Sequence, residues 1–189
     1  MTVLPELVER RARRALAADP IAEEIVSRLL EAATLPPSCF NSQPWRIVAV
    51  SGERLAEVRA ALSENNKWAL RAPLIAVFAT RPALDCRLDA GRDMALFDLG
   101  QSALAFMLQA TREGLYAHPI AGFAPAKVAK AVDLPEDFVI ATLVIVGRPG
   151  DESLLSERQV SGEHDARQRR PLGEVAFRDR FGEAWTAPG

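Results

Sequence analysis

Arginine side chains are concentrated in two short segments, one near each end of the chain, and they form its most conspicuous chemical feature. The arginines concerned are Arg10, Arg11, Arg13, Arg14, Arg167, Arg169 and Arg170. Guanidinium groups suit bidentate recognition of phosphate, so the two segments could converge on one phosphate group. Charge runs are otherwise usually solvated faces. The residues alone leave both interpretations open.

A rigid polar loop is the second candidate binding element. The stretch from Pro36 to Val50 reads PPSCFNSQPWRIVAV and leads directly into an apolar run. Prolines restrict the backbone, and loops on a stiff scaffold often hold ligands. Backbone N–H groups between Pro37 and Asn41, with the Asn41 side chain, could bond a polar ring. The loop alone does not identify that ring.

Cysteine and histidine offer weaker signals. Cys39, Cys86, His118 and His164 match no metal-ligand spacing. Cys39 could be a nucleophile with His118 as its base, but a loop cysteine is more often a small packed residue. The two cysteines do not indicate a disulfide framework, and we expect free thiols, as in a reducing compartment. No Gly-rich phosphate loop of common spacing occurs.

Composition excludes several classes of protein. The chain has 189 residues, of which 49% are hydrophobic, and its net charge is −2. That balance argues against a general nucleic-acid binder, which normally has a basic excess. No apolar run reaches the roughly 18 residues of a membrane span, and the N-terminus lacks the order of a signal peptide. We therefore expect a cytoplasmic protein without a nucleic-acid or membrane partner.

The elements that must position these residues are interleaved helices and strands. Hydrophobic periodicity and turn residues predict helices over 4–17, 20–35, 52–63, 94–111 and 125–132. Strands are predicted over 46–50, 73–80 and 138–147, with a loop over 113–123. The absence of a regular βαβ rhythm favours an α+β fold over a doubly wound α/β fold.

The helix predicted over 94–111 has consequences beyond one chain. Its sequence, MALFDLGQSALAFMLQAT, is apolar nearly all round, and helices of that kind are buried. One small chain can hardly cover every side of it, which suggests a dimer core. The polar, charged segment after Pro149 is too long for a plain loop, so it could wrap a neighbouring subunit.

These segments, in this order, resemble the nitroreductase family of FMN-dependent oxidoreductases. RRARRAL resembles the family's Arg-Arg-Ser-x-Arg-x-Phe opening, and PPSCFNSQPWRIVAV resembles its Pro-Ser-Ser-x-Asn-x-Gln-Pro-Trp loop. NNKWALRAPLIAVF resembles the Asn-containing segment before the second strand, and DLGQSALAFMLQATREGL the long central helix. HPIAGF and RQRRPLGEV resemble the Pro-Ile-Glu-Gly-Phe turn and the basic C-terminal element. The matches run from about Arg10 to Val175.

The resemblance implies a single nitroreductase-like domain over 1–189. Its fold would be α+β, with a mixed central sheet flanked by helices, in an intertwined homodimer with a long buried central helix. Residues 150–189 would form a C-terminal extension that reaches the partner subunit. Two FMN molecules would lie at the dimer interface, and no metal is implied.

The resemblance also implies a set of cofactor-binding residues. The set comprises Arg10, Arg11, Ala12, Arg14, Pro37, Ser38, Cys39, Asn41, Asn65, Trp68, Pro119, Ile120, Ala121, Gly122, Arg167 and Arg169. The arginines would hold the phosphate and ribityl end, the turn over 119–122 would face the flavin near N5, and Asn41 would come from across the dimer. Ala12 replaces the family's usual Ser, and Ala121 replaces an acidic residue of many members.

The implied activity is transfer of hydride from NADH or NADPH, through flavin N5, to an oxidised acceptor. Nitroaromatics and quinones are the family's usual acceptors, reduced in a ping-pong sequence. No side chain needs to act as acid or base, so no catalytic residue is predicted. One alternative is an FMN-binding carrier or sensor without reductase turnover. Another is a phosphate-binding interaction module without flavin.

Overall fold

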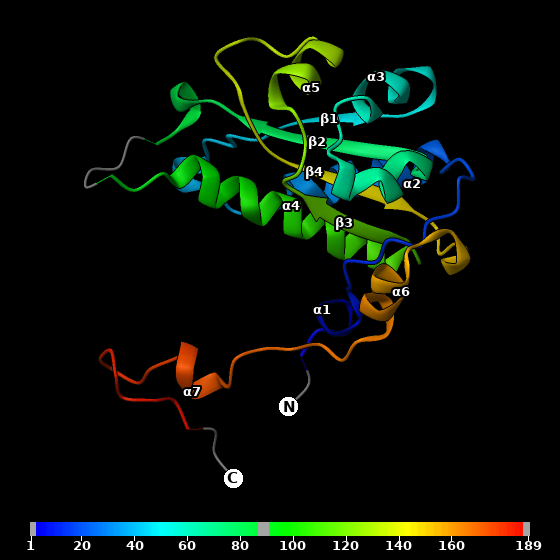
Figure 1. Cartoon of the computed structure of the whole chain (residues 1–189). Coiled ribbons are helices and arrows are strands. Elements are labelled where there is room, and N and C mark those ends of the chain that lie inside the picture. Colours follow the sequence, from blue (N-terminus) through cyan, green and yellow to red (C-terminus); the bar gives the residue numbers. More distant parts are fainter. Residues whose placement is uncertain (1–2, 87–90, 187–189) are drawn as a thin grey trace.

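A four-stranded sheet between two layers of helices forms the body of the molecule (Figure 1). A computed structural model describes residues 3–86 and 91–186. The strand order is β1-β2-β4-β3, with β1 at Arg46–Val50, β2 at Leu74–Thr80, β3 at Tyr116–Ile120 and β4 at Val139–Gly147. The predicted α+β fold is confirmed. Every pairing of these four strands is antiparallel, so the expectation of a mixed sheet is not met within one chain.

Strand β2 is buried on both faces and divides the core in two. Leu74, Ala76 and Phe78 point to one face, where α2 (Glu23–Thr34) and α4 (Met94–Arg112) pack. The alternate residues of β2 point to the other face, which α3 (Leu55–Arg59) and α5 (Pro125–Ala131) cover. Successive side chains of a strand point to opposite faces, so a fully apolar strand needs helices on both sides.

Two local predictions were wrong. The segment predicted as a loop over 113–123 contains β3. Because β3 is an edge strand, it tolerates Pro119, which cannot donate a ladder hydrogen bond. The helix predicted over 4–17 is limited to α1 (Pro5–Glu9). Residues 10–15 are irregular, and Leu16 forms a β-bridge with Pro149, so Arg10 and Arg14 do not share one helical face.

The remaining predictions were close. The helix predicted over 20–35 begins at Glu23, and the one predicted over 52–63 divides into a 3-10 turn, η2 (Gly52–Arg54), and α3. Other 3-10 turns are η1 (Cys39–Asn41), η3 (Glu64–Arg71), η4 (Pro82–Leu84) and η5 (Glu152–Leu154). The central helix α4 begins and ends within one residue of its predicted bounds.

Helix α4 packs one face on the sheet and exposes the other. Leu99, Ala103 and Phe106 are buried in the core. On the opposite side Phe97 is 60% exposed and Leu104 39% exposed. Within the described part of one chain, therefore, the sheet and α2 cover α4, and the side that carries Phe97 and Leu104 is left exposed.

The tail leaves the body of the molecule after β4. Helix α6 (Glu157–His164) lies near α1, and the chain then runs outward to α7 (Leu172–Val175) (Figure 1). Among the described helices, none combines the length and the apolar run needed to cross a bilayer.

Candidate functional site

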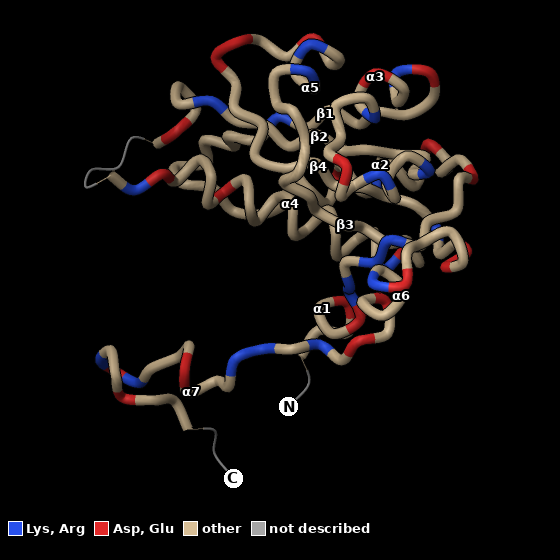
Figure 2. The backbone as a smooth tube through the Cα atoms, viewed as in Figure 1, with Lys and Arg blue, Asp and Glu red and all other residues tan. Residues whose placement is uncertain are grey.

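The two arginine segments lie side by side in the folded chain. Figure 2 shows basic residues in the segment after α1 and again along the tail beyond α6. The guanidinium group of Arg167 donates to the carbonyl oxygens of Leu7 and Val8 at 2.8 Å each, and also to that of Arg10. These bonds join the tail to the end of α1, so the predicted convergence of the two clusters occurs within one chain.

Positive charge accumulates around Arg10. Partial burial, followed by the guanidinium groups of Arg167, Arg169 and Arg11, lowers the pKa of Arg10 from its ordinary value. Like charges held together in this way favour an anion between them. Arg169 is exposed, and among the described residues its side chain donates to the backbone carbonyl of Gln168 at 2.6 Å. Its guanidinium group is thus available to a ligand.

Helix α6 fixes the segment that carries Arg14. Glu163 is 1% exposed; its Oε1 accepts a hydrogen bond from the Arg14 N–H at 3.0 Å and lies 3.8 Å from the Arg14 guanidinium. Arg11 donates to the carbonyl of Asp165 at 2.5 Å. Sequence reasoning missed Glu163, because a single acid in a polar tail carries no local signal of burial.

The turn over 119–122 is held in place by hydrogen bonds that its carbonyl groups accept. The carbonyl oxygen of Ile120 accepts from the Thr142 hydroxyl at 2.9 Å. That of Gly122 accepts from the Asn66 side chain at 2.9 Å and from the Ser63 N–H at 3.1 Å. Among the described residues, none accepts a hydrogen bond from the N–H groups of Ala121 and Gly122. The turn can therefore present these donors to a ligand.

Asn66, rather than the predicted Asn65, makes the contacts within this region. Asn65 is exposed, whereas the Asn66 amide bonds the turn and its Oδ1 accepts from the Trp68 indole N–H at 3.3 Å. Because Asn65 and Asn66 are adjacent and of the same type, the sequence alone does not tell which of them contacts the turn. An added Cβ at Gly122 would lie 2.6 Å from the Asn66 amide nitrogen and from the Ser63 hydroxyl oxygen, so both side chains would have to shift.

Trp68 connects the turn to the arginine segment. Its ring lies 4.6 Å from the His118 ring, centroid to centroid, and His118 Nδ1 lies 3.1 Å from the carbonyl oxygen of Arg13. Burial lowers the pKa of His118 to about 4, with smaller contributions in the same direction from Arg14 and Arg10. The imidazole is therefore neutral at pH 7 and donates from Nδ1. Its role here is to hold two parts of the site together.

The expectation of free thiols was wrong. Cys39 and Cys86 form a disulfide with their Cα atoms 6.0 Å apart. Because the two cysteines are 47 residues apart, their spacing does not reveal that η1 and the segment after η4 meet in space. With its thiol bonded, Cys39 is not a nucleophile activated by His118. His164 instead pairs with Glu152 at 2.6 Å, so the four residues do not gather around a metal.

The loop that contains Pro37, Ser38, Cys39 and Asn41 is attached to the start of α4. The Cys39 N–H donates to Asp98 Oδ2 at 2.9 Å, and Asp98 is 2% exposed. Phe40 and Asn41 both adopt positive φ, at 50° and 56°. Phe40 is 89% exposed and Asn41 is also exposed, so the loop presents both to the surroundings of the chain.

One chain does not bring this loop to the arginines. The loop is tied to α4 at Asp98, whereas α1 is tied to the other end of α4 by an ion pair between Arg112 and Glu6 at 3.6 Å. At 1.5 Å per residue, the two anchor points are roughly 21 Å apart along the helix. Within the described part of the chain, no hydrogen bond or ion pair links the loop to the arginine clusters.

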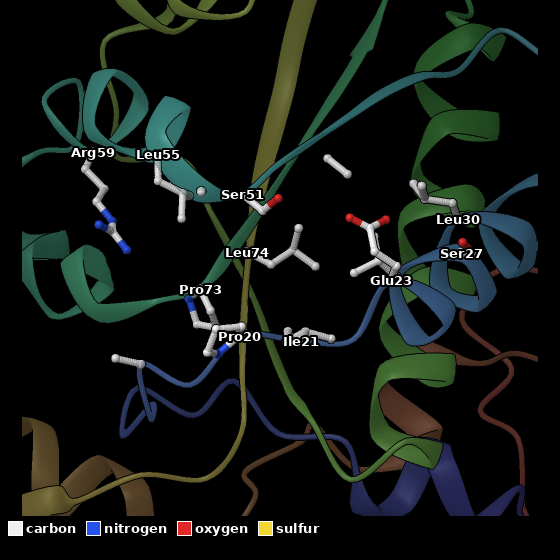
Figure 3. Close-up of a pocket in the computed structure, with 14 residues that line it drawn as sticks. Pro20, Ile21, Glu23, Ser27, Leu30, Ser51, Leu55, Arg59, Pro73 and Leu74 are labelled. Atoms are coloured by element: carbon white, nitrogen blue, oxygen red, sulfur yellow. The ribbon is translucent and has the colours of Figure 1, made fainter.

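A small hollow of about 160 Å³ is lined by Arg14 and Trp68, two of the predicted cofactor residues. A larger one, with a volume of about 510 Å³, lies between α2, α3 and the start of β2 (Figure 3). Arg59 and Glu23 stand on opposite sides of it, with Leu74 and Pro73 between them. No predicted cofactor residue lines this hollow. The candidate site is instead an open surface around the arginines and the turn.

The arrangement suits a ligand with a phosphate and a flat polar ring. The arginines supply a concentrated positive charge with exposed donors, and the turn supplies backbone donors on a rigid support. Ala12 and Ala121 are both exposed and add no charge or hydroxyl to this surface. These features fit the phosphate and ring of FMN, and they include no general acid or base aimed at a substrate.

Comparison with known proteins gives a consistent result. Residues 7–148 match the model of the Nitroreductase family. An NADH dehydrogenase of Thermus thermophilus is 28% identical over 181 residues, covering 80% of this chain and 88% of the relative. A 5,6-dimethylbenzimidazole synthase of Rhodospirillum rubrum is 30% identical, covering 81% and 84%. The crystal structure of an oxidoreductase containing FMN superposes with a TM-score of 0.85 at 28% identity, covering 97% of this chain and 94% of that one.

Proposed function

This chain belongs to the nitroreductase family, and we propose that it is an FMN-dependent oxidoreductase. When bound, the flavin would accept hydride from NADH or NADPH at N5 and pass it to an oxidised acceptor such as a nitroaromatic or quinone, in a ping-pong sequence. The observation that carries the proposal is the convergence of arginines from both ends of the chain beside a rigid turn. The FMN and NADH named for its relatives support it.

The arginines would bind the phosphate and ribityl end of FMN. Arg10 and Arg169 contribute charge, and Arg167 holds the two segments together through carbonyl groups. Charge-assisted hydrogen bonds to phosphate are about twice as strong as neutral ones. Arg11 and Arg14 lie in the same segment and are held by Asp165 and Glu163, which limits the freedom that ligand binding must remove.

The turn over 119–122 would face the ring of the flavin. Because its carbonyls are bonded to Asn66, Ser63 and Thr142, the N–H groups are already oriented when a ligand arrives. Donors fixed in this way stabilise negative charge without reorganisation. Trp68 and His118 would keep the turn and the phosphate site at a constant separation.

We propose that a second copy of the chain completes the site. Antiparallel packing of two α4 helices would place the start of one beside the end of the other. Asn41, Cys39, Ser38 and Pro37 of one subunit would then lie near the arginines of the other. The exposed apolar face of α4, at Phe97 and Leu104, supports this arrangement.

The tail over 150–189 would act as an extension onto the partner subunit. Beyond α6 it runs away from its own body (Figure 1), and it exposes large apolar side chains. Phe181 is 91% exposed, and Leu172, Val175 and Trp185 are also exposed. Apolar groups on an outlying segment gain burial only by contact with another surface.

The visible spectrum of the purified protein tests the proposal. We expect a flavin absorption band after incubation with FMN, its bleaching by NADH or NADPH without oxygen, and its return when a nitroaromatic or quinone is added. Protein that binds FMN but is bleached by neither nicotinamide would be a carrier or sensor. Protein that remains colourless after incubation would rule out both and leave the phosphate-binding module.

A further inference from the structure

A disulfide joins the proposed flavin loop to a distant part of the chain. Cys39 lies in η1, and Cys86 lies 47 residues later, after η4. Their Cα atoms are 6.0 Å apart, and both residues are partly exposed. The bond therefore closes a long loop of chain at the site, and a thiol reagent in solution can reach it.

The loop has a backbone conformation that it would not keep by itself. Phe40 and Asn41 are consecutive residues with φ of 50° and 56°, and Gln43 has φ of 46°. The left-handed region is unfavourable for residues other than glycine, above all for a bulky one such as Phe40. Such conformations persist where the surrounding structure imposes them.

Besides the carbonyl of Pro44, which accepts from the Thr80 hydroxyl at 2.8 Å, the loop has two anchors to sequence-distant elements, and both attach to Cys39. One is the hydrogen bond from its N–H to Asp98 of α4, and the other is the disulfide. Other side-chain bonds of the loop are local: the Gln43 N–H donates to the Ser38 hydroxyl, the Gln43 amide to Asn41, and the Arg46 guanidinium to the Gln43 carbonyl. Loss of the disulfide would thus leave a single distant hydrogen bond to hold Cys39.

We propose that the Cys39–Cys86 bond is a thiol-sensitive lock that sets the affinity of the loop for FMN. The proposal rests on the proposed function, because it takes this loop as part of the flavin site. In the oxidised protein the loop is held in its binding conformation. After reduction it samples other conformations, and the fraction of protein competent to bind falls, which weakens the apparent affinity.

The chemical step is thiol–disulfide exchange with a dithiol. A thiolate of the dithiol attacks one cysteine sulfur, the Sγ–Sγ bond breaks, and a mixed disulfide forms. The second thiol of the reagent then displaces the bound sulfur. The protein gains two thiols, whose protons come from the reagent, and the reagent becomes its own disulfide by loss of two electrons.

FMN titrations of the apoprotein test the lock. One sample is kept oxidised; another is reduced with dithiothreitol, which is then removed by desalting under argon. A thiol assay should find no free thiol in the first sample and two per chain in the second. We expect the reduced protein to bind FMN roughly tenfold more weakly, in line with a fall of the competent fraction to about one tenth.

Cys86→Ser provides the matched variant, because it removes the disulfide and leaves the loop residue Cys39 in place. It should bind FMN as weakly as the reduced wild type, and dithiothreitol should not change its affinity. Equal affinities of oxidised and reduced wild type would overturn the lock while leaving the proposed function intact, and so would two free thiols in the untreated protein. If the oxidised protein bound no FMN at all, the proposed function itself would fail. Should Cys86→Ser not fold, the comparison of oxidised and reduced wild type still decides.

Discussion

At the scale of single residues, the arginines of the site differ in what their guanidinium groups contact. Arg167 donates to three backbone carbonyls of the opposite segment, so its removal would break these bonds and leave those of Arg11 and Arg14 to the tail. Arg169 is exposed and bonds the neighbouring carbonyl of Gln168. Arg169 is therefore the residue whose loss should affect a bound phosphate with little effect on the fold.

Arg169→Ala is expected to weaken FMN binding by roughly 10-fold to 150-fold, which corresponds to a charge-assisted hydrogen bond of about 1.5–3 kcal/mol. Riboflavin lacks the phosphate, and its affinity should hardly change. Fluorescence titrations with both flavins measure the two effects. Arg170→Ala is the control, because Arg170 is exposed and pairs with Glu174 at 3.9 Å. Equal losses of FMN and riboflavin affinity would show that Arg169 supports the fold instead.

His118 should make stability depend on pH. Its pKa is about 4 in the folded chain, against an ordinary value of 6.5, because the ring is buried. Between these values the unfolded chain binds a proton that the folded chain does not. The contribution is therefore fully present above pH 6.5 and is lost as the pH falls towards 4, by about 3 kcal/mol in total.

Urea unfolding of wild type and His118→Asn at pH 7 and pH 4.5 measures this contribution. Asparagine retains an N–H donor for the Arg13 carbonyl but does not titrate. Other acidic groups titrate in both proteins, so the difference between the two pH profiles isolates the histidine. If the free energies of unfolding of the two proteins changed with pH by the same amount, His118 would be accessible to solvent and to protons.

The sequence located the regions of the site better than the individual contacts. The arginine clusters lie side by side, as one of the two interpretations of the sequence requires, and the Arg13 carbonyl bonds His118, which precedes the turn over 119–122. Asn66, Glu163 and Asp98 were missed, because their importance depends on burial against segments far away in sequence. The disulfide was missed for the same reason. Residue type and spacing report chemistry, whereas pairing across the fold depends on tertiary packing.

At the scale of elements, the junction between β4 and the arginine segment depends on a close approach of two backbones. Leu16 forms a β-bridge with Pro149, and the Gly150 N–H donates to the Ala15 carbonyl at 2.9 Å. A Cβ at Gly150 would lie 2.3 Å from backbone atoms of Leu16 and Ala17. Because the overlapping atoms belong to the backbone, no change of side-chain rotamer could relieve that overlap.

Gly150→Ala is therefore expected to destabilise the protein by about 1–3 kcal/mol, as overpacking typically does, and to disturb the arginine segment. Gly162→Ala in α6 is the matched control. Its Cβ would lie 3.6 Å from the Arg14 guanidinium, an ordinary contact, and alanine favours a helix. Denaturant midpoints should fall for the first variant and not for the second. A midpoint for Gly150→Ala equal to that of the wild type would mean that the two backbones separate at little cost.

Elements with a strong local pattern were predicted well, and those decided by their neighbours were not. Strand β2 and helix α4 have long apolar stretches whose identity does not depend on context. Strand β3 contains His118 and Pro119, which disfavour a strand, and it forms because β4 offers a free edge. Residues 10–15 have helical propensity, but the carbonyls there bond Arg167 and His118 instead. Tertiary contacts outweighed propensity in both places.

At the scale of the whole molecule, two features indicate that a second copy of the chain packs on α4. One is the exposed apolar face of this helix, and the other is the separation of the loop from the arginines. Phe97 and Leu104 lie seven residues apart on one side of the helix, with Gly100 between them, which is the spacing of a helix–helix seam. Gly100 has no side chain, and apart from its own neighbours along the helix none of the described residues lies within 4 Å of the place that a Cβ would take. A partner helix can therefore approach α4 closely at this point. A partner helix on this face would bury the apolar groups that one chain leaves exposed.

Leu104→Glu should therefore separate the subunits without unfolding them. The side chain is 39% exposed in the single chain, so a carboxylate there can remain solvated in a monomer, whereas in a dimer seam it would be buried without a partner. Leu70→Glu is the control, because Leu70 is a 43% exposed apolar residue in η3, away from α4. Light scattering at micromolar concentration should give a dimer for the wild type and the control, and a monomer for Leu104→Glu. Because the arginines and the loop would then belong to separate molecules, the monomer should also lose FMN affinity in proportion to dissociation. A monomeric Leu104→Glu that binds FMN as tightly as the wild type would place the complete flavin site within one chain and contradict the shared site.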